Sequence, residues 1–308
     1  MQNIKMERYS SYKDSGVEWI GEVPEGWEVK RLKYIAKAVL GKMLCNEDKG
    51  NYSLKPYLKS KNIQWLNVDV SSVDEMWFSP KELMEYRLKK GDLVLSEGGE
   101  VGKTCIWNDE LQECYIQNSA HKVSFIGNFV PEYYLYVLFT FGKFGVFDSI
   151  VNKVSIGHLT KDKLINLELP VPPKSEQTRI AHFLDQKTAQ LDQAIAQKEQ
   201  LIELLKERRQ ILIQNAVTRG LDPNVKMKDS GVEWIGEVPE HWEIMRAKFL
   251  FNEIDDRSNT GDEELLSVSH LTGVTPRSEK NVTMFQAEDY TGSKLCKKGD
   301  LVFNIMWA

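Results

Sequence analysis

The sequence predicts a mixed α+β protein: a β-rich module, then a long coiled-coil-type helix, then the start of a second copy of the module. Three observations lead to this fold class. Short apolar or alternating runs bounded by glycine and proline fill the first half of the chain, one uninterrupted amphipathic stretch covers 175–219, and the opening segment recurs after that stretch. With 308 residues the chain is long enough for two domains.

The composition is that of a globular protein without a targeting segment. The N-terminal stretch has no apolar core, and no run of about 18 apolar residues predicts a membrane span, so we expect a cytoplasmic protein. The formal net charge of −5 means that any surface for a polyanion must be a local patch. The four cysteines form no CxxC pair and stand at no ligand spacing from a histidine, so we expect reduced thiols and no metal.

The first module is expected to consist mostly of short strands. The tryptophans of the opening segment, Trp19 and Trp27, are expected to pack on its surface, with ligand stacking as the less favoured alternative. A core helix is predicted after Pro131, where apolar residues have helical spacing at Tyr134, Val137, Leu138 and Phe141. Predicted strands lie at 65–68, 93–95, 115–118, 122–125 and 165–171.

Polar loops with the residue types that contact nucleic acids adjoin these strands. Residues 55–65 interleave lysines with aromatic and amide side chains, which suits phosphate contact and base-edge readout, although a solvated loop fits equally well. A second glycine-containing polar loop covers 153–160. His121 has no acid or cysteine partner, so we interpret it as structural or as a polar contact.

The segment SEGGEVGKT at 96–104 resembles a phosphate-binding P-loop that follows a strand. That motif needs glycine at position 97, where this chain has Glu, and no long helix follows. We therefore reject nucleotide binding and predict a glycine-rich hairpin or loop. Its backbone N–H groups and Lys103 could approach a phosphate of another kind.

One long helix is predicted from Ser175 to Arg219, with Ser175 as a cap and Gly220 as a stop signal. At ~1.5 Å per residue it is a rod of roughly 67 Å. Alternate steps of four and three residues give ten positions with the spacing of a coiled-coil seam, seven of them apolar. Apolar residues outside the seam, such as Leu201 and Ile211, also allow a long helix that lies on an ordinary core. The ten positions are Leu184, Thr188, Leu191, Ile195, Lys198, Ile202, Leu205, Arg209, Leu212 and Ala216.

An internal repeat sets the domain organisation. Residues 13–35 recur at 228–250 with 17 of 23 positions identical, the first thirteen without a break, and KKGDLV at 89–94 returns at 297–302. The second unit lacks the later half of the first and its own long helix, so we infer a truncated chain. We expect a first domain at 1–173, a spacer helix at 174–220, a linker at 221–227 and an incomplete second domain at 228–308.

Catalytic motifs are missing from the sequence. It contains no amino-methyltransferase (D/N/S)PP(Y/F/W) tetrapeptide, no GxSxG, no HExxH, no complete phosphate loop and no nuclease carboxylate–lysine cluster. This favours a binding protein over an enzyme. Duplicated modules held apart by a rod suit an extended ligand that is contacted at two points, and DNA is such a ligand.

Several motifs closely resemble the specificity subunit of type I restriction-modification systems. The resemblance is carried by KDSGVEWIGEVPEGWEVKRL at 13–32, the GDLV strand with its glycine-rich loop, IQNSAHKV at 116–123, IGHLTKDKLINLELPVPPKSEQTRIAHFLD at 156–185, and the repeated opening motif. It implies two target-recognition domains that each read half of a split DNA sequence, and two long helices that pack antiparallel as a spacer. It also implies a non-catalytic chain that recruits modification (methyltransferase) and restriction subunits, on which S-adenosylmethionine, ATP and magnesium are expected.

The candidate DNA contacts are polar residues of loops next to strands, not positions at which the family motif fixes a base contact. They are Lys59, Lys61, Asn62, Ser96, Gly98, Gly99, Lys103, Asn118, Lys153, Ser155 and His158. Without a second helix the apolar seam is exposed, so a homodimer through the helix is one expectation. The alternative function is a truncated scaffold or decoy that binds the modification subunit through its helix without productive DNA reading. The helix-pairing residues are Leu184, Leu191, Ile195, Ile202, Leu205 and Leu212.

Overall fold

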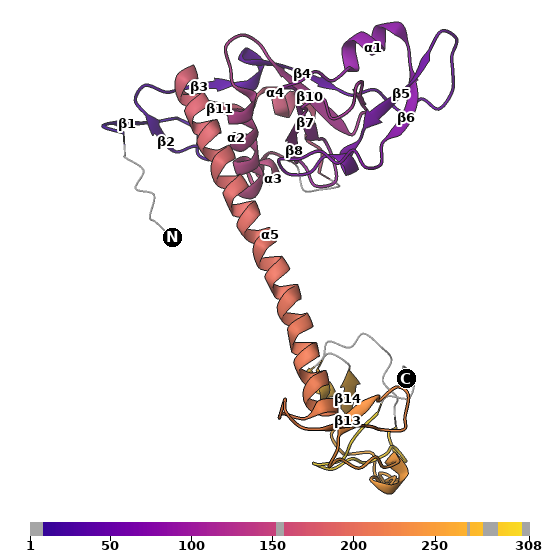
Figure 1. Ribbon diagram of the computed structural model, residues 1–308. Helices are drawn as coiled ribbons and strands as arrows, with labels where there is room; N and C mark the ends of the chain where they lie inside the picture. Colours follow the sequence, from indigo (N-terminus) through magenta and orange to yellow (C-terminus); the bar gives the residue numbers. More distant parts are fainter. Residues whose placement is uncertain (1–8, 152–156, 270–271, 280–288, 304–308) are drawn as a thin grey trace. The chain divides into compact units, whose positions relative to one another are not determined.

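The computed structural model describes residues 9–151, 157–269, 272–279 and 289–303 of the chain. The backbone forms two units, Met1–Leu201 and Ile202–Ala308, and a long helix, α5 (Lys174–Arg219), belongs partly to each (Figure 1). A β-rich module, a long helix and further short strands make up the mixed α+β class that the sequence predicts. Within the described part of the chain, no helix combines the length and the apolar character needed to cross a bilayer.

The central sheet of unit 1 has four antiparallel strands in the order β4–β10–β7–β8. Successive side chains of a strand point to opposite faces, so Leu93 and Leu95 enter one core cluster while Val94 enters another. The sheet is therefore covered on both faces, and the strands predicted at 93–95 and 122–125 are confirmed. The bounds are Ala36–Leu40 for β4, Leu93–Ser96 for β7, Thr104–Ile106 for β8 and Ala120–Phe125 for β10.

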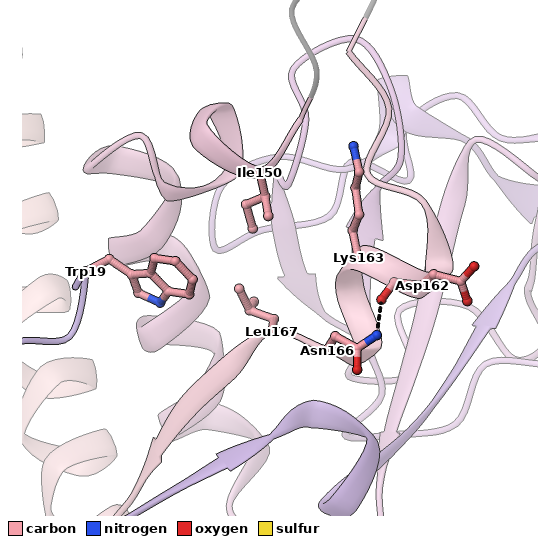
Figure 2. Close-up of a pocket in the computed structure, with 6 residues that line it drawn as sticks. All are labelled: Trp19, Ile150, Asp162, Lys163, Asn166 and Leu167. Carbon is pink, nitrogen blue, oxygen red and sulfur yellow. Dashed lines mark hydrogen bonds between the residues drawn. The ribbon is translucent and has the colours of Figure 1, made fainter. Parts of the chain in front are cut away.

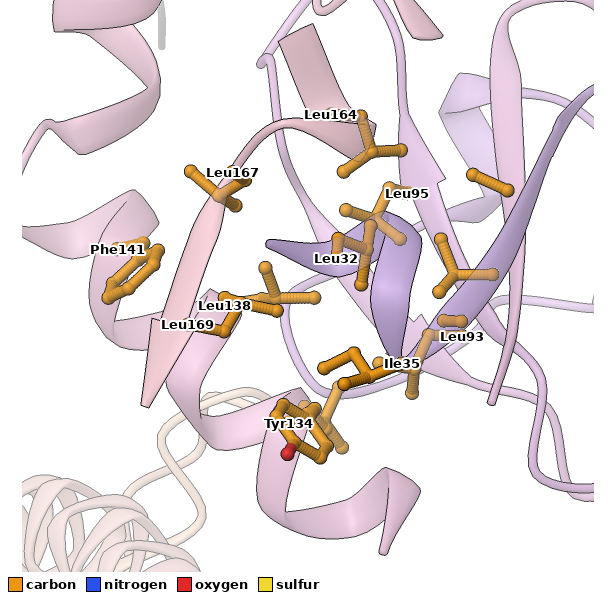
Figure 3. Packing of buried hydrophobic residues seen from close by; sticks show 14 of the residues in the cluster. Leu32, Ile35, Leu93, Leu95, Tyr134, Leu138, Phe141, Leu164, Leu167 and Leu169 are labelled. Carbon is orange, nitrogen blue, oxygen red and sulfur yellow. The ribbon is translucent and has the colours of Figure 1, made fainter. Parts of the chain in front are cut away.

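Three helices that precede α5, together with Ala181 of α5, contribute to the larger core cluster. From α2 come Tyr134, Leu138 and Phe141, which pack with strand residues such as Leu93 and Leu95 (Figure 3). Full burial of each such side chain stabilises the fold by ~1.5–3 kcal/mol relative to exposure. The core helix predicted after Pro131 is thereby confirmed. The helices are α2 (Pro131–Lys143), α3 (Val146–Ile150) and α4 (Lys161–Ile165).

A smaller sheet, in the order β6–β5–β9, adjoins two of the polar segments, 60–65 after β5 and 117–119 after β9. A 3-10 helix, η2 (Ser60–Asn62), follows β5, and helix α1 (Pro80–Tyr86) follows β6. Ser79 caps α1: its Oγ accepts the N–H of Glu82, whose carboxylate accepts the N–H of Ser79 at 2.8 Å. The strands are β5 (Ser53–Leu58), β6 (Asp74–Phe78) and β9 (Tyr115–Ile116).

Two of the predicted strands differ in position from those in the structure. Residues 65–68 form a tight bend in which Leu66 has φ +66°, a backbone conformation that a strand cannot contain. The predicted strand at 165–171 begins only at Glu168, because Ile165 ends helix α4. The remaining strand, β11 (Glu168–Val171), pairs with β3 (Glu28–Arg31) from the opening segment. Short apolar runs suit helix and strand alike, so periodicity alone could not separate these cases.

Helix α5 matches the predicted long helix except at its start. The N–H groups of Glu176 and Gln177 both donate to the carbonyl of Pro173, so Ser175 lies inside the helix and does not cap it. Gly220, at φ +77°, ends the helix as predicted. Only the first turns pack on the module: Gln177 and Ala181 are buried, whereas Leu191 and Leu212 are 62% and 58% exposed. The alternative of a helix lying on an ordinary core therefore fails beyond these turns.

After helix α5, unit 2 repeats the hairpin that stands at the start of unit 1. Strands β1 (Tyr12–Asp14) and β2 (Glu22–Pro24) pair Lys13 with Val23, and strands β12 (Met227–Asp229) and β13 (Glu237–Pro239) pair Lys228 with Val238. The shared GDLV motif also forms the same turn in both units. The Asp92 carboxylate accepts the N–H of Lys89, and the Asp300 carboxylate accepts the N–H of Lys297. The sequence repeat is thus a structural repeat.

The two copies differ after the hairpin. In unit 1, Leu32 of the 3-10 helix η1 (Leu32–Tyr34) and Ile35, which follows this helix, are fully buried. The counterpart of Ile35 in unit 2, Leu250, is 59% exposed, next to the 3-10 helix η3 (Ala247–Phe249). No described residue pairs with 243–246, the counterpart of β3. Unit 2 also contains the hairpin β14 (Leu266–Ser269) and β15 (Gly273–Pro276) and a 3-10 helix, η4 (Arg277–Glu279).

Candidate functional site

The structure brings the predicted polar loops together through a chain of hydrogen bonds. Ser60 donates its N–H to the Oγ of Ser119 at 3.0 Å and its own Oγ–H to the Ser119 carbonyl at 2.8 Å. The Ser119 carbonyl also accepts the N–H of Glu97 at 2.9 Å, and the Glu97 carbonyl accepts the N–H of Leu159 at 2.8 Å. We call the four segments that meet here, 60–65, 97–103, 117–119 and 157–159, the loop surface.

The glycine-rich segment 97–103 joins antiparallel strands β7 and β8, so the predicted hairpin loop is confirmed. Gly102 has φ +78°, and a Cβ there would lie 2.2 Å from the Cδ2 of Phe147, so the close packing requires glycine. Among the described residues, no acceptor faces the backbone N–H groups of 98–101. Backbone N–H groups in such a loop are of the kind that can bind an anionic ligand.

Lys103 is held at the base of this loop by two partners. Its Nζ lies 2.8 Å from the Oε2 of Glu100 and donates to the Oε1 of Gln64 at 3.2 Å. Trp65 donates its indole N–H to the other Glu100 oxygen at 2.6 Å. The hydrogen bonds from Lys103 and Trp65 lower the pKa of Glu100, which is therefore a carboxylate at neutral pH. A phosphate that contacts Lys103 must compete with this carboxylate.

Trp65 ties the loop surface to helix α2. Its ring packs so closely over Gly142 that a Cβ at that position would lie 2.0 Å from the Cη2 of Trp65. The ring meets Phe139 edge-on at 5.6 Å, and the Lys143 Nζ lies 5.2 Å from the ring centroid of Trp65. Lys143 therefore adds a cation beside the loop surface that sequence reasoning missed.

Lys59 and Lys61 converge on one carboxylate. The Lys59 Nζ forms an ion pair with Asp74, and the Lys61 Nζ lies 3.8 Å from the Oδ1 of the same residue. The hydrogen bond between Lys59 and Asp74 raises the pKa of the lysine and lowers that of the aspartate. Lys61 is the freer cation, since its side chain is 48% exposed.

Two histidines approach the loop surface in different ways. The His158 ring is half exposed, with Nδ1 3.5 Å from the Oε2 of Glu97 and close to Gly98. His121 is fully buried, and its Nε2 lies 2.6 Å from the Leu159 carbonyl, so Nε2 carries the proton and donates. Burial lowers the pKa of His121. The structural role predicted for His121 is confirmed, because it fastens the 157–159 segment to strand β10.

Three of the predicted DNA contacts are tied to their own loops. Asn62 is 2% exposed; its amide oxygen accepts the Lys59 N–H, and its amide N–H groups donate to the carbonyls of Asp69 and Ser72 at 2.9 and 3.0 Å. Ser96 is 1% exposed and donates to the Gly98 carbonyl at 2.7 Å. Both side chains are thus buried and shape their loops, and a DNA contact by either one stays a prediction. Half-buried Asn118 accepts a hydrogen bond from the Gln117 amide.

The loop surface therefore unites only part of the predicted site. It contains Gly98, Gly99, Lys103, Asn118 and His158, with Lys61 at its edge. Lys153 and Ser155 lie outside the described residues. Sequence reasoning missed Gln64, Glu97 and Ser119, although Gln64 stands inside the lysine-rich 55–65 stretch that it had singled out.

The chemistry of this surface is that of binding. It offers amide, ammonium and imidazole donors, and the described residues contain no group of three His, Cys, Asp or Glu side chains that could hold a metal ion. Three of the four free cysteines are buried. Burial raises the pKa of Cys105 and brings that of Cys114 to about 12, so neither is a thiolate nucleophile.

A family model and individual known proteins that resemble this chain indicate the same family. Residues 24–204 match the family described as type I restriction modification DNA specificity domain. The chain is 26% identical over 231 residues to the type I restriction enzyme MjaVIII specificity subunit of Methanocaldococcus jannaschii, covering 73% of this chain and 49% of that protein. It is 26% identical over 240 residues to the EcoKI specificity subunit of Escherichia coli, covering 74% and 48%.

A solved structure has a similar fold. It comes from work on complex assembly and conformational transition of the type I R-M system, and it superposes with a TM-score of 0.52 at 21% identity. The match covers 67% of this chain and 48% of that one. The chain spans about half the length of the curated relatives that it matches.

Proposed function

This chain belongs to the type I restriction modification DNA specificity domain family, and from that premise we propose that it is the non-catalytic DNA sequence-specificity subunit of a type I restriction-modification complex. Its first domain, residues 1–173, would read one half of a split DNA target. The observation that carries the proposal is the joining of separate loops into one donor-rich surface within the matched region. The match spans the β-rich module as well as the first part of helix α5, which favours DNA reading over a decoy that acts through the helix alone.

We assign two kinds of DNA contact to the loop surface. The N–H groups of 98–101, which have no acceptor among the described residues, suit phosphate oxygens together with Lys103 and Lys61; such contacts position a protein on DNA without reading sequence. Gln64, Asn118 and His158 carry amide and imidazole groups of the kind that read base edges. The ion pairs of Lys103 with Glu100 and of Lys59 with Asp74 keep these lysines in place before DNA arrives.

Catalysis and its cofactors belong to the partners in this proposal. Modification subunits would bring S-adenosylmethionine, and restriction subunits would bring ATP and magnesium. Helix α5, as the spacer of residues 174–220, would pair with a second long helix, and a second copy of this chain can supply one. Residues 221–227 would then link the spacer to the second domain at 228–308.

Mapping of methylated adenines tests the proposed function. DNA that is modified by the complex reconstituted from this chain and its modification subunit should carry methyl groups at one defined, split sequence. Methylation at unrelated sites, or an unchanged pattern after the loop surface is altered, would contradict a role in sequence reading.

A further inference from the structure

The turn between helices α2 and α3 exposes one phenylalanine. Phe144 is 81% exposed, more than any other aromatic side chain among the described residues of unit 1. Phe141, near the end of the same helix, is buried in the core. A single exposed apolar group on an ordinary surface needs no explanation, so the surroundings of Phe144 decide what it can do.

Both sides of this turn are fastened to the loop surface. On one side, Gly142 packs so closely against the Trp65 ring that a Cβ at this glycine has no room. On the other side, the Phe147 ring covers Gly102 of the glycine-rich loop with equally close packing. Phe144 therefore stands between two contacts with the loop surface, and its exposed ring lies beside that surface.

The backbone of the turn is held without help from the Phe144 side chain. The N–H of Phe144 donates to the Thr140 carbonyl at 3.0 Å, and Gly145, at φ +73°, ends the helical path so that α3 can begin. At the far end of α3, Ile150 lines a shallow pocket together with Trp19 (Figure 2). Loss of the Phe144 ring should thus leave the turn in place.

The charge of the turn argues against a phosphate site. Segment 142–148 carries one lysine, Lys143, and one carboxylate, Asp148, so its side-chain charges cancel. The group that distinguishes the turn is the apolar ring. A DNA duplex offers apolar contact only at the faces of its bases and at thymine methyl groups, because its backbone is charged.

A phenyl ring on a DNA-facing turn suits the base stack. Apolar side chains of DNA-binding proteins insert between adjacent base pairs, partly unstack them and kink the duplex. The kink costs least at flexible pyrimidine–purine steps, so this contact adds a sequence preference without a hydrogen bond to any base. Lys143, which precedes the ring, supplies a cation for the phosphates beside the opened step.

We propose that Phe144 is a wedge that inserts between two adjacent base pairs of the DNA target and kinks the duplex at that step. The proposal rests on the proposed function, because the ring reaches a base step only if the loop surface faces DNA. Phe144 is then a specificity-determining residue: the target should contain a pyrimidine–purine step at the position where the ring inserts.

The test compares DNA bending by wild-type and variant chains in the complex reconstituted with the modification subunit. The probe is a duplex with the methylated sequence found by mapping, labelled at both ends for energy transfer. The wild type should bend it by about 20–90°. Phe144→Ala should lose most of the bend and bind at least about 10-fold more weakly, with unchanged stability of the chain. Phe144→Leu should keep most of the bend, because leucine also acts as a wedge.

A second measurement locates the opened step. The fluorescent adenine analogue 2-aminopurine, which brightens when it unstacks, replaces in turn each adenine that is not methylated. One position should brighten with the wild type and stay dim with Phe144→Ala. A mismatch at that step lowers the cost of unstacking, so it should strengthen binding of the wild type more than that of Phe144→Ala. Tyr34→Ala is the matched control, because Tyr34 is 69% exposed on η1, outside the loop surface.

The possible results separate the wedge from the proposed function. Unchanged bend and affinity in Phe144→Ala would overturn the wedge and leave sequence reading intact. If Phe144→Ala no longer joins the modification subunit, the ring contacts protein and the proposal fails. It also fails if deoxyuridine in place of thymine causes the same loss of affinity without any bend in the wild-type complex, because the ring then contacts a thymine methyl group. A wild-type complex that binds target and scrambled duplexes alike overturns the proposed function, and the wedge with it.

Discussion

Lys103 and Gln64 contact each other but should contribute differently to DNA binding. Lys103 suits a phosphate, so Lys103→Ala should weaken binding to all sequences alike and lower the salt slope by about one. Gln64→Ala should instead reduce the preference for the target by about 5- to 150-fold. Fluorescence anisotropy with target and scrambled duplexes at several salt concentrations measures both effects. Lys90→Ala is the control, since Lys90 is an exposed lysine outside the loop surface; an equal loss in that variant would contradict the assignment.

The buried His121 makes the stability of unit 1 sensitive to acid. Because burial lowers its pKa in the folded state, the unfolded chain binds the proton first as pH falls below about 6.5. Above that pH the neutral ring makes its full contribution to the free energy of unfolding. This contribution is lost as the pH falls from the unfolded to the folded pKa of His121, by no more than about 1.4 kcal/mol per pH unit. Urea unfolding at pH 7.5 and 5.5 should show a smaller difference for His121→Gln than for the wild type.

The residue types predicted the chemistry of the site better than they predicted which residues belong to it. Lys103, Gly98 and His158 lie where the loops meet, as their polar and glycine-rich surroundings indicated. Asn62 has the same chemistry, yet it is buried because three hydrogen bonds within its own loop satisfy its amide. Such satisfaction depends on the path of the backbone between residues 62 and 72, which propensity and spacing do not determine.

At the scale of elements, the long periodic segments were predictable and the short ones were not. Helix α5 follows from 45 residues of sustained amphipathic pattern, and α2 from four apolar residues at helical spacing. The bend at 65–68 cannot be predicted from its apolar residues. It is determined by the packing of Trp65 on Gly142 and by the hydrogen bond from the Leu66 N–H to the Thr104 carbonyl. Those contacts join segments far apart in sequence.

The contact between the 60–65 loop and helix α2 can be broken at one glycine. In Gly142→Ala the new methyl group would lie 2.0 Å from Trp65, so the ring must move away. We expect a loss of roughly 1–3 kcal/mol in the free energy of unfolding, as for other overpacked sites, with a shift in tryptophan fluorescence. Gly26→Ala is the control: a Cβ there meets no atom within 4 Å, and the copy already has His241 at this position. Equal stability of both variants would show that Trp65 is not held by α2.

At the scale of the whole molecule, the repeat was the strongest signal in the sequence. The identical 13–25 and 228–240 segments form hairpins of the same register in both units. Burial did not follow from identity, because Trp19 is 39% exposed in unit 1 while its identical counterpart Trp234 is 86% exposed in unit 2. Sequence similarity predicts local hydrogen bonding, and the rest of a module determines what is covered.

The exposed seam of α5 leads to a prediction about assembly. Leu191, Ile195, Ile202, Leu205 and Leu212 are each more than half exposed, and a helix that pairs through them buries one continuous apolar stripe. We therefore expect a dimer at micromolar concentration in size-exclusion chromatography with light scattering. Ile195→Asp with Ile202→Asp should give a monomer, because each dimer would then bury four carboxylates in the seam.

The opposite side of the same helix supplies the matched control. Gln193 and Gln200 lie five residues beyond seam positions Thr188 and Ile195, on the face farthest from the seam, and both are exposed. Gln193→Asp with Gln200→Asp adds the same charge to the same helix and should leave the dimer intact. A wild-type chain that elutes as a clean monomer would refute self-pairing. The stripe would then require a helix from another chain to cover Leu191 and Leu205.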